Sequence, residues 1–202
     1  WQVYSVTRGQ RRRKPLAPFR TSTLQQEASR RLRFTAQRTM AIAQQLYQGD
    51  SLDGDNMGGL ITYMRTDSVQ VSPQAQEQAQ TYICEQYGED YLPVNPPSYP
   101  KGRGSQEAHE AIRPTLVGRT PDALQDSLSR DQHRLYQLIW RRFVGSQMSE
   151  AIYQTLRVDV RAVGEQHNYD FRANGDQIEF LGFLRVYEPA ASEDDRGDKE
   201  SQ

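Results

Sequence analysis

The chain has 202 residues, 36% of them hydrophobic, and a formal net charge of -1 at pH 7, which argues against a uniformly basic nucleic-acid binder. Its single cysteine, Cys84, excludes an internal disulfide bond and a cysteine-rich zinc site. No apolar stretch approaches the roughly 20 residues that a membrane-spanning helix needs, so we expect no membrane segment.

The first quarter of the chain is predicted to pass from strand to helix. Trp1–Val6 is rich in aromatic and β-branched residues, which favours a strand, and residues 7–20 carry a basic run and two prolines, which favours a linker. Apolar residues at helical spacing then predict one helix starting near 21–23 and a second at about 36–47. The buried stripe of the second helix would be Met40, Ala43, Leu46 and Tyr47.

The middle of the chain is predicted to alternate loops and helices. The Gly- and Asp-rich stretch from Gly49 to Gly59 is a predicted loop, and Gly59–Tyr63 is a short run that favours a strand. Helices are predicted at Pro73–Tyr87 and Arg130–Met148, with a short one near 121–127. Asp50, Asp53 and Asp55 do not match a calcium-loop spacing, so no metal site is predicted.

The last quarter is predicted to be β-structure, because apolar and polar residues alternate from about Ile152. Asn174 and Gly175 predict the turn of a hairpin, and Gly182–Tyr187 predicts a further strand. The order strand, helices, strands predicts an α+β fold in which a helical block is inserted between strands of one sheet.

The segment Leu60–Ser68, LITYMRTDS, contains residue types that could attack a phosphodiester. A tyrosine hydroxyl is a poor nucleophile until its proton is removed or its anion is stabilised. Arg65 could grip a phosphate in two places, and Asp67 could orient that arginine. A tyrosine packed at a strand end, with Arg65 and Asp67 paired on the surface, explains the same residues.

Two further segments allow both a structural and a functional interpretation. In Gln106–Thr115, QEAHEAIRPT, His109 could bond a phosphate oxygen or assist a proton transfer, or it could be a satisfied loop histidine beside a capping Arg113. In Thr21–Gln26, TSTLQQ, the hydroxyls could cap a helix, or they and the free amides could hold a backbone phosphate.

Together and in this order, the three segments resemble those of the bacterial type IA DNA topoisomerases. That family shows a TSTLQQ-like helix start, an ITYMRTDS active-site strand and an EAHEAIRP segment, and the resemblance is strong over about residues 15–150. Met64 favours the topoisomerase I branch over the topoisomerase III branch.

The resemblance implies an ATP-independent isomerase that relaxes negatively supercoiled DNA by transient single-strand cleavage, strand passage and religation. Tyr63 would form a 5′-phosphotyrosine link, Arg65 would support the charge on the scissile phosphate, and His109 would help to place the DNA. Further DNA contacts are expected from Thr21, Ser22, Gln25, Thr62, Asp67 and Arg113.

The resemblance also implies an arrangement of domains. A mainly helical domain, residues 15–151, would be inserted into a β-rich arch formed by residues 1–14 and 152–189, and residues 190–202 would be a disordered acidic tail. The family's acidic metal-binding domain is not found in this sequence. No cofactor is therefore expected in this chain, Mg²⁺ is expected in the full-length enzyme, and the isolated piece is expected to be inactive.

The expected partners are single-stranded or negatively supercoiled DNA and the missing N-terminal acidic domain of the same chain, in the bacterial cytoplasm at the nucleoid. No membrane is expected to take part. The competing hypothesis is a non-catalytic module that binds single-stranded nucleic acid.

Overall fold

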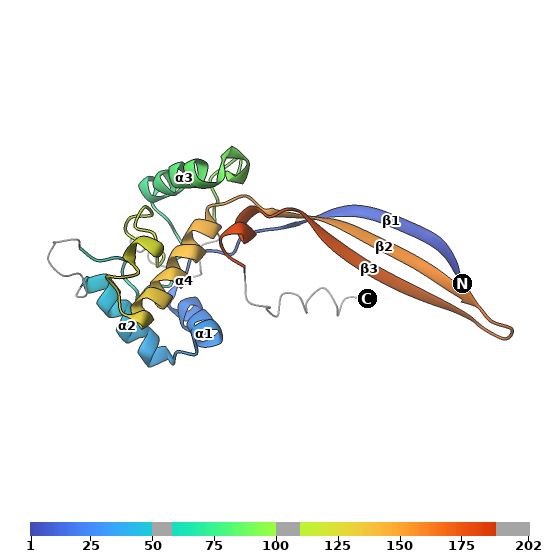
Figure 1. Cartoon of the computed structure of the whole chain (residues 1–202), viewed down its shortest axis with the longest axis horizontal. Helices are drawn as coiled ribbons and strands as arrows, with labels where there is room; N and C mark the ends of the chain where they lie inside the picture. The colour runs from blue at the N-terminus through green and yellow to red at the C-terminus, as the bar shows by residue number, and fades with distance from the viewer. Residues whose placement is uncertain (50–57, 100–109, 189–202) are drawn as a thin grey trace.

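The computed structural model describes residues 1–49, 58–99 and 110–188, which form a long β-ribbon and a helical body (Figure 1). The ribbon is a three-stranded antiparallel sheet of β1 (Gln2–Arg13), β2 (Ala151–Val163) and β3 (Asn168–Phe180), in that order. The α+β class and the order strand, helices, strands are as predicted. The other elements of the described chain are α1 (Thr21–Leu32), α2 (Ala36–Gln48), α3 (Pro73–Tyr87), η1 (Glu89–Tyr91), η2 (Asp122–Leu124), α4 (Arg130–Ser146) and η3 (Gly182–Arg185).

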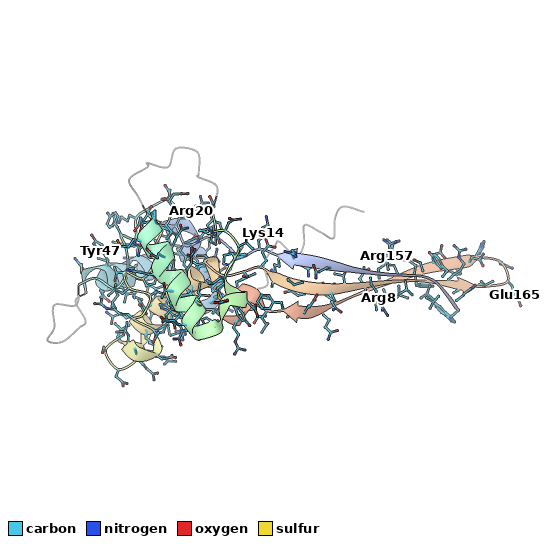
Figure 2. The ribbon with its side chains drawn as sticks, turned by 90° about the horizontal axis from the view of Figure 1, so that it is seen from above. Arg8, Lys14, Arg20, Tyr47, Arg157 and Glu165 are labelled. Atoms are coloured by element: carbon cyan, nitrogen blue, oxygen red, sulfur yellow. The ribbon has the colours of Figure 1, made fainter. Side chains whose placement is uncertain are left out.

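Strand β1 is longer than its sequence predicts. Residues 7–13, predicted as part of a linker, continue the strand to Arg13, so that prediction is wrong. The reason is the central strand β2, which gives β1 a hydrogen-bonding partner from Gln2, opposite Arg161, to Arg13, opposite Ala151. The basic residues of this run are thereby placed on the ribbon (Figure 2).

The hairpin predicted at Asn174 and Gly175 is also wrong. Both residues lie inside β3, where they pair with Arg157 and Leu156 of β2. The chain reverses instead between β2 and β3, where the amide of Gly164 donates to the carbonyl of His167 at 3.1 Å. Continuous pairing with a long neighbouring strand outweighs the local turn preference of an Asn-Gly pair.

The segment predicted as a last strand, Gly182–Tyr187, forms the 3-10 turn η3 instead. Gly182 has a φ of 49°, and a β-carbon placed there would stand 2.3 Å from the carbonyl oxygen of Glu150. The chain therefore turns against the start of β2 at a position that only glycine fits. This turn brings Tyr187 back onto α4, where its β-carbon lies against Gly145.

Helix α4 is the centre of the body. Its start has the reciprocal hydrogen bonds of a capping box between Ser129 and Gln132, and its apolar residues recur at helical spacing as predicted. Tyr136 and Trp140 of this helix are core residues, and their polar atoms donate to the carbonyls of Arg119 and Val117. None of the described helices combines the length and the apolar character needed to cross a membrane.

A buried charge joins the ribbon to the body. The guanidinium of Arg142 on α4 donates to the carbonyl of Ala17 at 2.6 Å and to the hydroxyl of Tyr187 at 3.1 Å. The Tyr187 hydroxyl in turn donates to Glu27 of α1 at 3.1 Å. This network connects the segment after β1, two helices and the segment after η3, and it satisfies a charge that would be costly to bury alone.

Arg33, which ends α1, has a backbone conformation that suits glycine. Its φ is 61° and its ψ is 30°, and its amide closes the helix by donating to the carbonyl of Ala28. We expect Arg33→Gly to raise the free energy of unfolding by about 1 kcal/mol, because a left-handed conformation costs a residue with a β-carbon about that much. Chemical denaturation of the two chains measures the difference.

The matched control is Arg30→Gly in the last turn of the same helix, where glycine should lower the free energy of unfolding by about 1 kcal/mol. A loss of stability in both variants would contradict the conformational explanation for Arg33.

Candidate functional site

The segment Leu60–Ser68 crosses the body between α2 and α3 with one face buried and one exposed. Met64, Thr66 and Ser68 are buried, whereas Tyr63 has 43% of its surface exposed and Arg65 and Asp67 are also exposed. The strand predicted at the start of this segment is only a single bridge, in which Ile61 pairs with Pro114. The alternation nevertheless turns the three predicted site residues of this segment toward solvent.

Thr62 fixes this segment to the residues around Arg113. Its hydroxyl donates to the carbonyl of Ala111 at 2.6 Å and accepts from the amide of Arg113 at 3.0 Å. Its own amide donates to the carbonyl of Arg113 at 2.9 Å. Thr115 extends the contact, because its amide donates to the carbonyl of Leu60 at 3.0 Å. Thr62 therefore has a structural role at the base of Tyr63, and a DNA contact by this residue stays a prediction.

Thr21 fixes the same segment from the other side, at the start of α1. Its hydroxyl lies 2.8 Å from the carbonyl of Met64 and 3.0 Å from that of Thr66, and it accepts from the Thr66 amide at 2.9 Å. The amide of Thr21 also donates to the Thr66 carbonyl. Together with the bonds of Thr62, these contacts bring described residues of all three predicted segments together at the backbone next to Tyr63.

The predicted capping of α1 takes a different form in the structure. Arg20 is the N-cap residue, and the hydroxyl of Thr23 accepts from its amide at 3.1 Å. Glu27, further along the helix, does not take part in the cap and binds Arg31 at 2.8 Å. Ser22 and Gln25, the other predicted DNA contacts on this helix, are partly exposed on its first turns.

Arg65 and Asp67 are exposed and unpaired. Neither side chain has a hydrogen bond or an ion pair with another described residue. The surface ion pair between them, which was the structural interpretation of these residues, is therefore not formed. An arginine with no partner among the described residues, two residues from an exposed tyrosine, is available to bind an anionic ligand.

Arg113 is held by a carboxylate that the sequence analysis did not single out. Its side chain is 12% exposed and lies 2.6 Å from Glu110, whose other oxygen accepts from the amide of Ser72 at the start of α3. The Nε of Arg113 is buried without a hydrogen-bond partner. The spacing of three residues between Glu110 and Arg113 is the signal that could have predicted this pair. A DNA contact by Arg113 stays a prediction, and His109 lies outside the described residues.

Tyr47 contacts Tyr63, which the sequence did not predict. It was predicted to be part of the buried stripe of α2, but it is 40% exposed, so that prediction is wrong. Leu46 already occupies the core side of the last turn, and the next residue points about 100° away. The Tyr47 ring instead lies against the Tyr63 ring, with centroids 5.5 Å apart. Figure 2 places Tyr47 on the body, far from the ribbon tip at Glu165.

Comparison with known proteins identifies the family. A family model described as DNA topoisomerase matches residues 1–201. The full-length topoisomerase I of Thermotoga maritima is 38% identical and superposes with a TM-score of 0.78, over 93% of this chain and 29% of that chain. The chain therefore belongs to the bacterial type IA DNA topoisomerases, as the three segments indicated, and it spans less than a third of the solved relative's length.

The Thr21 hydroxyl should contribute to stability, whatever its role in binding. We expect Thr21→Val to lower the free energy of unfolding by about 1–3 kcal/mol, because it removes the hydroxyl that partners the Met64 carbonyl and the Thr66 amide. Thr21→Ser retains the hydroxyl and should lose clearly less. Chemical denaturation distinguishes them, and equal stability of the two variants would contradict the structural role.

The Glu110 carboxylate should make stability depend on pH. Burial alone would raise its pKa, but hydrogen bonds from Ser72 and the charge of Arg113 outweigh it and lower the pKa below the ordinary value of 4.5. This contribution is fully present above pH 4.5 and is lost as the pH falls through the lower, folded-state pKa. We expect Glu110→Gln to be less stable than the unmodified chain at neutral pH and to lose less stability on acidification. Denaturation curves measured across this range test it, and parallel pH profiles would contradict it.

Proposed function

We propose that Tyr63 is the nucleophile of a type IA topoisomerase that relaxes negatively supercoiled DNA in bacterial cytoplasm. The observation that carries the proposal is an exposed tyrosine on a fixed backbone, two residues from an exposed arginine that has no partner among the described residues. The buried tyrosines of the body, such as Tyr136, donate their hydroxyls to the protein instead. Family membership supplies the reaction, transient cleavage of one DNA strand.

In the proposed step, the Tyr63 oxygen attacks the phosphorus of a phosphodiester in single-stranded DNA. An oxygen–phosphorus bond to Tyr63 forms, the bond to the 3′ oxygen breaks, the phenol proton is lost and the leaving 3′ oxygen gains a proton. Arg65 binds the phosphate and stabilises the negative charge that builds on its oxygens. Asp67, His109 and the residues near the start of α1 would help to bind and place the strand.

The 5′-phosphotyrosine link conserves the energy of the broken phosphodiester, so religation after strand passage needs no ATP. The 3′-hydroxyl attacks the phosphotyrosine, re-forms the DNA backbone and releases Tyr63. Arg65 would serve both directions, because the same charge develops on the phosphate in each.

Magnesium would act outside the part of the chain that the structure describes. No group of three or more His, Cys, Asp or Glu side chains in the described residues could hold a metal ion. The Glu110 carboxylate, which lies beside Arg113, is already bound to Arg113 and to the amide of Ser72. We propose that an N-terminal acidic domain of the full-length enzyme binds Mg²⁺ and covers this site, and that the chain alone does not cleave DNA.

The family arrangement also gives the two parts of the structure a proposed role. The helical body would be the inserted domain, residues 15–151, and the ribbon would be part of the arch, residues 1–14 and 152–189. The ends of two strands support this proposal, since β1 ends at Arg13 and β2 begins at Ala151. The residues after β3 depart from it, because Tyr187 packs against α4.

The decisive variant is Tyr63→Phe in the full-length parent enzyme. The variant keeps the ring but lacks the attacking oxygen, so we expect no covalent protein–DNA adduct while affinity for single-stranded DNA is retained. A labelled single-stranded oligonucleotide, incubated with each enzyme and denatured before electrophoresis, shows the adduct directly.

The matched control is Tyr136→Phe, which removes the hydroxyl of a fully buried tyrosine that donates to the Arg119 carbonyl and should leave the adduct intact. An adduct formed by Tyr63→Phe as well as by the unmodified enzyme would overturn the assignment. It would favour the alternative in which the chain is a non-catalytic module that binds single-stranded nucleic acid.

A further inference from the structure

The Tyr63 side chain has one aromatic neighbour among the described residues, Tyr47 at the end of α2. The two ring centroids are 5.5 Å apart and the rings are inclined by 67°, an edge-to-face arrangement. Such pairs contribute about 0.5–1.5 kcal/mol beyond the area that they bury. The contact is thus strong enough to favour some orientations of the Tyr63 ring over others.

The backbone holds the two residues in fixed relation. The amide of Leu60 donates to the carbonyl of Leu46 at 2.8 Å, which joins the last turn of α2 to the segment that carries Tyr63. A β-carbon placed on Gly59 would stand 2.0 Å from the carbonyl oxygen of Tyr47. The backbone at Gly59 therefore passes the end of α2 at a distance that only glycine allows. The backbone of Tyr47 therefore has little freedom to move away from the segment that carries Tyr63.

The contact does not bury the pair as core residues are buried. Tyr47 and Tyr63 are 40% and 43% exposed, whereas the aromatic residues of the body core, Phe19 and Tyr136, are fully buried. Tyr47 contacts the Tyr63 ring, and part of the Tyr63 surface stays open to solvent. A ring in this position can limit rotation without blocking the approach of a DNA strand.

We propose that Tyr47 is a positioning residue whose ring restricts the Tyr63 side chain to orientations from which its oxygen can attack. The inference rests on the proposed role of Tyr63 as the nucleophile. A tyrosine side chain rotates about two bonds, and attack requires its oxygen to stand in line with the bond that breaks. Holding the reacting groups near that geometry before the reaction lowers the entropic part of the barrier.

The test compares Tyr47→Ala and Tyr47→Phe in the full-length parent enzyme. The rate of adduct formation is measured in a single turnover at saturating labelled oligonucleotide. The Kd for the same oligonucleotide is measured in the Tyr63→Phe background, where no cleavage occurs. We expect Tyr47→Ala to slow adduct formation by about tenfold or more and to leave Kd unchanged. Tyr47→Phe keeps the ring edge and should restore the rate to within about twofold.

Gln48→Ala is the matched control, because Gln48 is the next residue of α2 and is exposed. Its side chain makes no hydrogen bond with another described residue. It should leave both quantities unchanged. A Tyr47→Ala variant that forms adduct at the normal rate would overturn the inference. A loss of affinity equal to the loss of rate would also overturn it, since it would make Tyr47 a contact for a DNA base. Failure of Tyr47→Phe to restore the rate would overturn it as well.

The two proposals fail in different ways. If Tyr63→Phe still forms adduct, Tyr63 is not the nucleophile and the role of Tyr47 falls with it. If Tyr63→Phe abolishes the adduct while Tyr47→Ala leaves its rate of formation unchanged, only the role of Tyr47 is lost.

Discussion

The hydroxyls of Thr21 and Thr62 hold the segment around Tyr63 to its neighbours, and the rest of the site depends on them. This segment has no regular strand or helix to satisfy its backbone, yet one of its faces is buried. Buried backbone groups need partners, and these two side chains supply donors and an acceptor on either side of Tyr63. Because the backbone is fixed from both sides, the exposed side chains of Tyr63 and Arg65 leave the body in set directions.

Two arginines of the ribbon are held by aspartates of β3. Arg11 on β1 binds Asp176 on β3, and Arg161 on β2 binds Asp170 on β3. Each pair joins two strands of an exposed sheet and contributes little stability, about 0–1 kcal/mol. Its consequence for binding is larger, because a paired arginine is less available to a phosphate. Arg65 in the body differs from these arginines, because it has no ion pair within the described part of the chain.

Local patterns predicted the helices well and the ribbon poorly, for one physical reason. The apolar spacing of α4 indicates which face of that helix meets the core, so the helix could be predicted from its own residues. The extension of β1 to Arg13 and the straight passage of β3 through Asn174 depend on pairing with β2, more than 130 residues from β1 in the sequence. At the site, residue chemistry alone left Tyr63 undecided. The order of three segments identified the family, whereas the contact with Tyr47 required the structure.

The tyrosines of the body differ in what their hydroxyls do. Tyr99 donates to the carbonyl of Ser146 and Tyr136 to that of Arg119, both at 2.6 Å, and burial raises the pKa of each. Tyr187 donates to Glu27, and burial raises its pKa too. These hydroxyls hold the fold together as neutral donors. Tyr63 makes no such bond with the described residues, so its oxygen can meet a phosphate without breaking a contact that the fold needs. The proposed nucleophile is thus held through its backbone and its ring, which leaves the oxygen free for the proposed reaction.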